Sequence, residues 1–514
     1  SFLMDGFFAA VPLIRKTRVH FHEFMRGVHR ELDELIELFG MAQAADGYLS
    51  TQVQLIPGRR RFGERIYHEL YNMGHFLTAA CVHHAATGKE TMLDLARKMA
   101  DYLDRVFSPR PPELAHFGWN PSNIMGLVDL YRATAEPRYL ELAELFVSLR
   151  GSAPDGSDQN QDRVPLREEH EAVGHAVTAT YLWCGAADVC AETGEPALQQ
   201  ALRRLWRDVV DRRLYITGGV GALHRGASRR HDMVWEAFGL NYELPNATAY
   251  NETCANIGLA MWAWRMLRLE PAVEYADVME TVLYNSALSG MSLDGLRFRY
   301  TNPLRWHGRE HDLLQHDSLE RWTVASSYCC PPQIARTLAG LYRQAYSLSE
   351  RGVWVHLYGA NELVTALGDG ALRLRQETDY PWSGRVVLTI EAAPARPLAL
   401  WLRIPGWADG ATVQIAEEPA GPLPAGEYGC LERVWRPGTT ITLELPLAVR
   451  KLVAHPRVEA AVNQIAVVRG PLVYCLESAD LPSKVGLAET HLPRDAELRP
   501  RWRPELLGGV VVLE

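Results

Sequence analysis

The densest group of residues able to do chemistry lies in the middle of the chain. It consists of one glutamate and two short runs: Glu236, Glu252-Thr253-Cys254 and Cys329-Cys330-Pro331-Pro332. Three thiolates and one carboxylate would complete a four-coordinate zinc shell. Because the paired CxxC spacing of a structural zinc ribbon is missing, unrelated thiols are the alternative interpretation.

The backbone around these residues decides whether they can act together. Glu252 and Cys254 are two positions apart at the start of a helical pattern, so they project together only if that segment is still extended. Pro331 and Pro332 predict an extended backbone at the residues before them, ahead of the next helical pattern.

Three histidines lie within or beside apolar helical patterns: His68, His75 and His175. Such a histidine is more often a core residue with satisfied hydrogen bonds than a catalytic one. His75 follows His68 by seven residues, or about two helical turns, so it can share that face or serve a structural role.

A helix-turn-helix pattern recurs through the first 345 residues and would have to position these groups. Four copies begin near residues 74, 123, 174 and 255, with prolines at the turns at 137, 196 and 271. The spacing of these prolines is too irregular for a solenoid of identical short repeats. We therefore expect a closed α/α barrel of helical hairpins, with a site where the loops converge.

Beyond about residue 350 the apolar period changes from 3.6 to 2. Short β-branched and aromatic runs such as RVVLTIEA and TTITLELPLAV are broken by Pro, Gly and Asp, which predicts antiparallel β-sandwich structure. We predict three domains: residues 1–345, 346–449 and 450–514.

Composition excludes several classes of protein. The 514 residues carry 53 Lys+Arg against 62 Asp+Glu, a net charge of −9, which argues against nucleic-acid binding. No apolar run reaches the length of a membrane span, so we expect no membrane partner. Eight cysteines are too few for a disulfide scaffold, and a reduced, cytoplasmic protein is expected.

Several sequence pieces, in order along nearly the whole chain, resemble glycoside hydrolase family 127, the β-L-arabinofuranosidase family. They are HELYNMGH, GHAVTATYL, LYITGGVGA, WEAFGLNYELPNATAYNETCANIGL, YCCPPQIART, YPWSG, LRIPGWA and VVRGPLVYCLE. The resemblance implies an (α/α)6 helical barrel followed by antiparallel β-sandwich domains, which agrees with the periodicity. It also implies a retaining glycoside hydrolase that removes a terminal β-L-arabinofuranoside from an oligosaccharide or glycoconjugate.

The resemblance assigns roles to individual residues. Cys329 matches the family's nucleophile and Glu236 its general acid/base. The Zn²⁺ ligands would be Glu252, Cys254, Cys329 and Cys330. His68 and His175 match residues that bind sugar hydroxyls.

Two departures from the family pattern bear on the substrate. Asn120 stands where the family has another hydroxyl-binding histidine. The loop at 222–235 is longer than usual and carries His224, Arg225, Arg229, Arg230 and His231. Guanidinium groups pair with carboxylates, so this loop could recognise a carboxylated, pectin-derived sugar, or it could be an ordinary solvated loop.

A non-catalytic alternative also remains open from the residues alone. It is a carbohydrate-binding protein whose zinc is structural. In either case we expect a homodimer that forms through the β domains.

Overall fold

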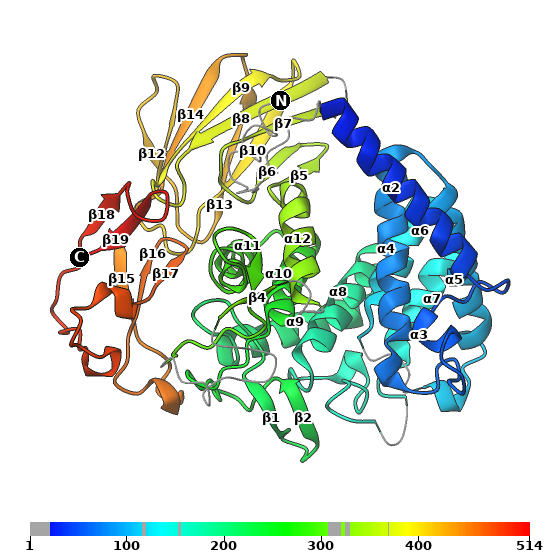
Figure 1. The fold of residues 1–514 in the computed structure, drawn as a ribbon. Coiled ribbons are helices and arrows are strands. Elements are labelled where there is room, and N and C mark those ends of the chain that lie inside the picture. The colour runs from blue at the N-terminus through cyan, green and yellow to red at the C-terminus, as the bar shows by residue number, and fades with distance from the viewer. Residues whose placement is uncertain (1–20, 116–119, 153–155, 307–319, 324–328, 369) are drawn as a thin grey trace.

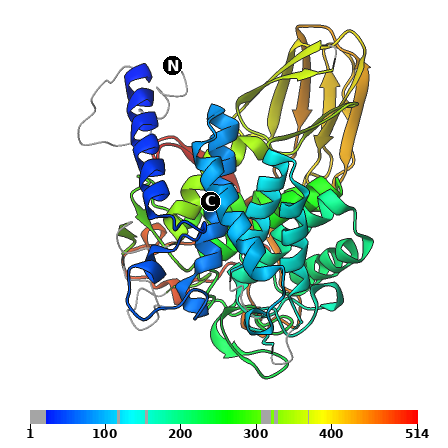
Figure 2. The ribbon, with the colours of Figure 1, turned by 90° about the vertical axis from the view of Figure 1, so that its right-hand side faces the viewer.

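The computed structural model describes residues 21–115, 120–152, 156–306, 320–323, 329–368 and 370–514. Helices fill most of the chain up to about residue 345, and strands fill most of the remainder (Figure 1). Figure 2 shows the yellow and orange strands standing at one end of the helical region.

Four helical hairpins appear where the sequence pattern predicts them. They are α4 (Glu69–Thr87) with α5 (Thr91–Phe107), α6 (Ser122–Thr134) with α7 (Pro137–Ser148), α8 (Ala176–Thr193) with α9 (Pro196–Arg212), and α10 (Thr253–Leu269) with α11 (Val273–Thr281). Pro137 and Pro196 open their helices, where a missing N–H has no partner to lose. Pro271 instead lies two residues before α11 begins.

Three other helices complete the described helical region: α2 (Phe21–Ala42), α3 (Thr51–Gln54) and α12 (Cys330–Gly340). Helix α2 runs along the outside of the hairpins (Figures 1 and 2). Helix α12 lies beside α10, so the Cys329–Cys330 run reaches the start of the fourth hairpin.

The first helices of successive hairpins pack against one another and form the interior. In α8 every residue from Ala176 to Cys190 is buried. Helices α4 and α6 approach closely at Gly74 and Gly126, where a Cβ on Gly126 would lie 2.5 Å from the Gly74 carbonyl oxygen. Only a residue without a side chain allows this approach.

Two sheets form the β-sandwich, in the strand orders β13-β10-β6-β5 and β12-β11-β14-β9-β8-β7. An apolar core that includes Val386, Leu388 and Ile390 fills the space between them. The strands are β5 (Tyr346–Ser349), β6 (Gly352–Val355), β7 (Asn361–Leu367), β8 (Gly370–Thr378), β9 (Arg385–Ala392), β10 (Pro397–Arg403), β11 (Thr412–Ile415), β12 (Gly421–Pro422), β13 (Tyr428–Val434) and β14 (Thr439–Glu444).

One strand pair departs from the expected antiparallel pattern. Strands β6 and β10 are parallel, with Gly352 opposite Ala399. A parallel pair needs a long crossover, and here the chain passes through β7, β8 and β9 of the opposite sheet before it returns.

Smaller sheets complete the described chain. The last segment holds the sheet β15 (Val449–Leu452), β16 (Ala466–Arg469) and β17 (Leu472–Tyr474), and the hairpin β18 (Pro500–Arg503) with β19 (Val510–Leu513). Within the helical region lie the hairpin β1 (Leu223–Ala227) with β2 (Met233–Ala237), and the pair β3 (Arg297–Phe298) with β4 (Trp322–Thr323).

A buried charge cluster joins the helices to the sandwich. Arg403, at the end of β10, is fully buried and forms ion pairs of 2.5 Å with Asp277 and Glu280 of α11. The hydroxyl of Tyr380 donates a 2.8 Å hydrogen bond to Glu280. We refer to these four residues as the Arg403 cluster.

The architecture confirms the predicted fold class, an (α/α)6-type helical barrel followed by β-sandwich structure. Among the described residues, no helix combines the length and apolar character that crossing a membrane requires.

Candidate active site

Cys329 and Cys330 stand at the start of α12. Cys329 is the residue before the first turn, with φ −105° and ψ −38°, and Cys330 is already helical. The prediction of an extended backbone before the two prolines is therefore wrong. Pro331 and Pro332 lie in the first turn, where a helix has N–H groups without partners, so the helix tolerates both rings.

Glu252 and Cys254 approach these cysteines from the start of α10. Glu252 precedes the helix with an extended backbone, φ −55° and ψ 133°, while Cys254 lies in its first turn. The sulfur of Cys254 is 3.6 Å from that of Cys330, and the sulfur of Cys329 is 3.8 Å from Cys330 and 3.5 Å from Glu252 Oε1. These contacts are far longer than the about 2.05 Å of a disulfide.

The four side chains have the separations that a tetrahedral metal site requires. With Zn–S bonds of about 2.3 Å and Zn–O bonds of about 2.0 Å, tetrahedral geometry separates two sulfurs by about 3.8 Å and a sulfur from an oxygen by about 3.5 Å. One ligand atom from each of the four residues lies within 4.8 Å of the others. Oε2 of the buried Glu252 has no hydrogen-bond partner among the described residues. The donor set therefore fits a metal ion.

The thiols differ in how their neighbours shift their pKa values. Burial raises the pKa of Cys254 and of Cys330 well above the usual thiol value. Hydrogen bonds from Cys254 and then from Cys330 lower the pKa of Cys329 well below it. Of the three thiols, Cys329 is therefore the one whose neighbours favour the thiolate form. Burial, followed by the charges of Cys329 and Glu236, raises the pKa of Glu252.

Glu236 lies on β2 and faces the same region. Its carboxylate accepts hydrogen bonds from Tyr250 Oη at 2.7 Å and from His175 Nε2 at 3.0 Å. Carboxylate oxygens of Glu236 and Glu252 and a ring nitrogen of His175 lie within 4.8 Å of one another, so Glu252 belongs to both groups. Glu236 has φ +51°, a left-handed backbone that is rare for a residue with a side chain. Strain of this kind clusters at functional sites.

The helix start at α8 determines which nitrogen of His175 carries the proton. His175 is the residue that caps α8, and its Nδ1 accepts the backbone N–H of Thr178 at 3.3 Å. A neutral ring that accepts at Nδ1 carries its proton at Nε2. His175 therefore donates to Glu236 and orients that carboxylate.

The other expected sugar-binding residues lie at helix starts nearby. His68 caps α4 with φ +51°, and burial, followed by the charge of His175, lowers its pKa. Asn120 is buried, also has φ +51°, and its Oδ1 has no hydrogen-bond partner among the described residues. His75 contacts Arg336 at 3.2 Å and Tyr71 by its ring, and burial lowers its pKa to about 3.

Sequence reasoning missed two tyrosines. Tyr250 holds Glu236, and the ring of His224 stacks on it with centroids 5.2 Å apart. The hydroxyl of Tyr300 is 3.7 Å from the sulfur of Cys329. Tyr250 lies two residues before Glu252, inside the quoted family motif, whereas Tyr300 carries no local signal.

The arginine-rich loop is the β1–β2 hairpin, and its turn points its charges at the protein's own acids. Arg229 forms an ion pair with Glu171 at 2.6 Å, and Arg230 pairs with Asp158 at 2.8 Å and Glu169 at 3.1 Å. These ion pairs hold Arg229 and Arg230 to the protein's own acids, and recognition of a carboxylated sugar beside Glu236 stays a prediction.

Comparison with known proteins identifies the family. The model described as "Beta-L-arabinofuranosidase, GH127 catalytic domain" matches residues 25–343. The family's middle-domain model matches residues 352–447, and its C-terminal-domain model matches residues 449–505.

Individual relatives agree with this assignment. The chain is 36% identical over 518 aligned positions to a non-reducing end β-L-arabinofuranosidase of Bifidobacterium longum subsp. longum, covering 93% of this chain and 76% of that protein. A solved β-L-arabinofuranosidase of the same family from Geobacillus stearothermophilus T6 superposes with a TM-score of 0.87 at 39% identity, covering 95% of this chain and 79% of that one. A structure described as a glycoside hydrolase gives a TM-score of 0.88 at 41% identity, covering 95% and 80%.

These matches extend over nearly the whole chain, and they confirm the resemblance found in its motifs. The protein is a glycoside hydrolase and belongs to glycoside hydrolase family 127.

Proposed function

We propose that the protein is a retaining β-L-arabinofuranosidase in which Cys329 is the nucleophile and Glu236 the general acid/base. The observation that carries this proposal is that the sulfur of Cys329 and the hydrogen-bonded carboxylate of Glu236 both lie close to Glu252. The relatives named as β-L-arabinofuranosidases support the substrate class.

Zinc is the metal we assign to the four-residue donor group. Glu252, Cys254, Cys329 and Cys330 would hold it, since three sulfurs and one oxygen at tetrahedral separations suit Zn²⁺. When bound, zinc supplies the positive charge that keeps these thiols deprotonated at neutral pH.

The first chemical step forms a bond to sulfur. The Cys329 thiolate attacks the anomeric carbon while the bond from that carbon to the leaving oxygen breaks. Glu236 gives its proton to the leaving oxygen, and the sugar remains as a thioglycoside on Cys329. His175 and Tyr250 position the Glu236 carboxyl group for this transfer through its two oxygens.

The second step releases the sugar with the configuration it started with. Glu236, now ionised, accepts a proton from water as the water oxygen attacks the anomeric carbon. The carbon–sulfur bond breaks, and its electron pair returns Cys329 to the thiolate. Two displacements at one carbon give net retention.

We assign sugar recognition to three residues: His68, His175 and Asn120. His68 and His175 interact electrostatically, and His68 also senses the charge of Cys329, so these groups lie around one space. The buried Oδ1 of Asn120, which has no hydrogen-bond partner among the described residues, offers an acceptor to a ligand.

A second candidate is the same machinery acting on a different sugar. Asn120 favours it, because an amide replaces the expected imidazole and changes both the reach and the donors of that position. A purely carbohydrate-binding role with a structural metal gains nothing from a glutamate held by two donors and a lowered thiol pKa at Cys329.

The decisive experiment is intact-mass spectrometry with a nitrophenyl β-L-arabinofuranoside. We expect Cys329→Ser to abolish turnover while the protein remains folded. Glu236→Gln should accumulate one pentose per chain, because attack on an activated glycoside needs no proton but deglycosylation needs a base. Cys430→Ser, which removes an exposed thiol on β13, is the matched control. Normal turnover by Cys329→Ser would eliminate the cysteine mechanism.

A further inference from the structure

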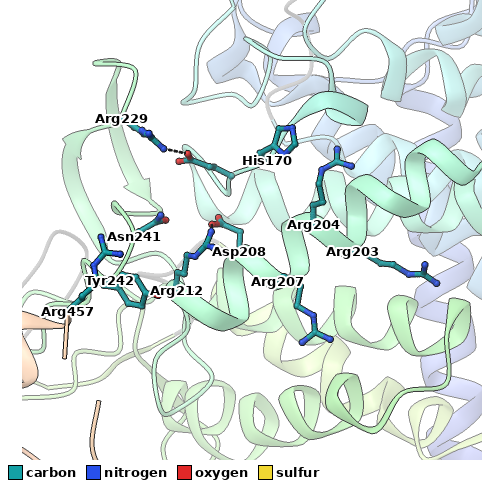
Figure 3. A pocket seen from close by; sticks show the side chains of 11 residues that line it. His170, Arg203, Arg204, Arg207, Asp208, Arg212, Arg229, Asn241, Tyr242 and Arg457 are labelled. Carbon is teal, nitrogen blue, oxygen red and sulfur yellow. Dashed lines mark hydrogen bonds and ion pairs between the residues drawn. The ribbon is translucent and has the colours of Figure 1, made fainter. Parts of the chain in front are cut away.

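A cavity of about 650 Å³ lies on the outer side of helix α9, away from the residues assigned to chemistry. Figure 3 shows that its side chains come from α9, from the turn of the β1–β2 hairpin, from the segment after β2 and from the C-terminal part of the chain. Six of them are arginines: Arg203, Arg204, Arg207, Arg212, Arg229 and Arg457.

The cavity holds more positive charge than its own acids neutralise. With the buried Arg213, which shares two of the same carboxylates, the group contains seven arginines. Five of them pair with four acids, Glu171, Asp208, Glu270 and Glu274, whereas Arg204 and Arg457 form no ion pair with any described residue. Three positive charges therefore remain in excess among these residues, although the whole chain has a net charge of −9.

Each of the two acids that line the cavity already pairs with two arginines. Asp208 accepts from the backbone N–H of Ala172 at 2.8 Å and from Arg213 at 2.7 Å, and it also pairs with Arg212 at 3.2 Å. Glu171 pairs with Arg229 at 2.6 Å and with Arg213 at 3.4 Å. Neither acid can neutralise a further arginine.

Several guanidinium donors remain available for an anion. Arg457 stacks on the ring of Tyr242 at 4.6 Å and forms no ion pair with any described residue. Arg203 and Arg207 each hold one carboxylate at a single nitrogen, although a guanidinium carries five N–H donors. The Nε of Arg204 is buried without a hydrogen-bond partner among the described residues.

The sequence of α9 concentrates these charges on one face. Arg203 and Arg207 are one turn apart, as are Arg204 and Asp208. The like charges of Arg203 and Arg207 repel each other at this spacing, which destabilises the helix. An anion bound between them would relieve that repulsion.

The size and walls of the cavity favour a saccharide over a small ion. Its volume falls within the range of ligand pockets, about 300–1,000 Å³, and is far larger than a single phosphate or carboxylate needs. Asn241 adds an amide, a group that binds sugar hydroxyls, and the ring of Tyr242, stacked on His455, carries Arg457 at the cavity wall.

The β1–β2 hairpin connects this cavity to the active site. Arg229 lies in its turn and Glu236 lies near the far end of β2. At about 3.3 Å per strand residue, the two are about 15–20 Å apart along the hairpin. One rigid element therefore carries a residue of each site.

We propose that this cavity is a second, non-catalytic binding site for the carboxylate groups of an acidic oligosaccharide. Guanidinium groups bind carboxylates through paired, charge-assisted hydrogen bonds. The site would hold a uronic-acid segment of a polysaccharide on which the enzyme acts. This proposal does not depend on the cysteine mechanism or on zinc.

Isothermal titration calorimetry with trigalacturonic acid tests the site directly. In low-salt buffer free of phosphate, the wild-type protein should bind the trisaccharide and lose affinity as salt is added. The fully methyl-esterified trisaccharide, which has the same rings without charge, should bind at least about tenfold more weakly.

Single substitutions then locate the binding. Arg207→Gln and Arg457→Gln each remove an exposed guanidinium, and each should weaken binding about tenfold. Arg433→Gln on β13, which removes an exposed arginine paired with Glu418, should leave binding unchanged.

Three outcomes would overturn the proposal. The first is no binding of trigalacturonic acid to the wild-type protein. The second is equal binding of the methyl ester. The third is inorganic phosphate that binds as tightly and displaces the trisaccharide, which would make the cavity a general anion site.

Discussion

Glu252 connects the two halves of the chemistry at the scale of single residues. Its oxygens lie among the three cysteines and also within 4.8 Å of Glu236 and His175. A metal bound by Glu252 therefore compensates a negative charge that Glu236 would otherwise face directly. The electrostatics of the acid/base residue and those of the nucleophile cannot be treated separately.

Removing the hydroxyl of Tyr250 tests how Glu236 is positioned. We expect Tyr250→Phe to lower kcat/KM by about tenfold to a hundredfold on alkyl arabinofuranosides, because a hydrogen bond to a charged group contributes about 1.5–3 kcal/mol. The loss should be smaller on nitrophenyl glycosides, whose leaving groups need no proton. Tyr215→Phe, which removes a hydroxyl bonded to the backbone carbonyl of Pro245 instead of to Glu236, is the control. Equal losses on both substrates would mean that Tyr250 acts only on structure.

Metal content provides an independent measurement at this scale. We expect one zinc per chain by elemental analysis of reduced protein, and a large loss of zinc in Cys254→Ser, since a hydroxyl is a far poorer zinc ligand than a thiolate. Cys430→Ser should retain the metal. Zinc-free active enzyme would refute the assignment.

Asn120 is the residue at which substrate preference can be changed. We expect the wild-type enzyme to be slow on plain β-L-arabinofuranosides and Asn120→His to raise kcat/KM about tenfold, since one buried hydrogen bond to the sugar is worth about 1–3 kcal/mol. Histidine tolerates the left-handed backbone at this position better than most residues. An unchanged or lower kcat/KM would show that the amide already suits the substrate.

The sequence allowed some of these residues to be predicted and concealed others. Cysteines and acids in short runs stand out by their chemistry, so Glu252, Cys254, Cys329 and Cys330 could be grouped before any fold was known. Tyr300 could not be grouped in this way, because a single tyrosine has no characteristic spacing, and Tyr250, although it lies in the motif beside Glu252, shows no sign there that it bonds Glu236. Their roles arise only when separate loops meet.

At the scale of helices and strands, periodicity predicts the hairpins well because their buried faces repeat every turn. It could not predict the backbone at Cys330, where packing of a fully buried thiol outweighs the local preference imposed by Pro331. It also could not predict the parallel pairing of β6 with β10, since pairing between distant strands leaves no local mark in either strand.

The close approach of α4 and α6 is an element-scale feature that can be tested by adding one methyl group. We expect Gly126→Ala to lower the free energy of unfolding by about 1–3 kcal/mol, because the new Cβ would lie 2.5 Å from a backbone oxygen that cannot move aside. Gly340→Ala in α12, where a Cβ meets no atom within 4 Å, should leave stability unchanged or slightly higher. Urea unfolding of the two variants compares them, and equal stability would show that α4 and α6 can separate freely.

At the scale of the whole molecule, the Arg403 cluster makes the helices and the sandwich interdependent. We expect Arg403→Met to cost about 3–5 kcal/mol, because it leaves the buried Glu280 and the half-buried Asp277 without their counter-ion. Arg433→Met, at an exposed pair, should cost far less.

Asp277 and Glu280, the acids that remain in Arg403→Met, determine whether its loss of stability grows or shrinks with pH. Burial raises the pKa of both Asp277 and Glu280, and the charge of Arg403 partly offsets this rise. Removing Arg403 therefore lets both pKa values rise further. Acids with raised pKa values in the folded state bind protons more tightly there, so the stability deficit should be greatest near about pH 8 and should shrink towards about pH 5. Urea unfolding at both pH values measures it, and a deficit independent of pH would contradict this account.

Three statements about the whole molecule stay predictions: the domain limits at 345/346 and 449/450, a homodimer through the β domains, and a cytoplasmic location. Size-exclusion chromatography with light scattering would measure the oligomeric state of the full chain directly.

The Arg403 cluster also restricts how this gene can be recombined. A barrel fused to a foreign sandwich inherits Asp277 and Glu280 without their counter-ion, so such a chimera should fold only if the donor sandwich brings an arginine to the equivalent strand end or if both acids become amides. The crossover point of a chimera should therefore be chosen so that Arg403, Asp277 and Glu280 stay together, and not simply where helices give way to strands.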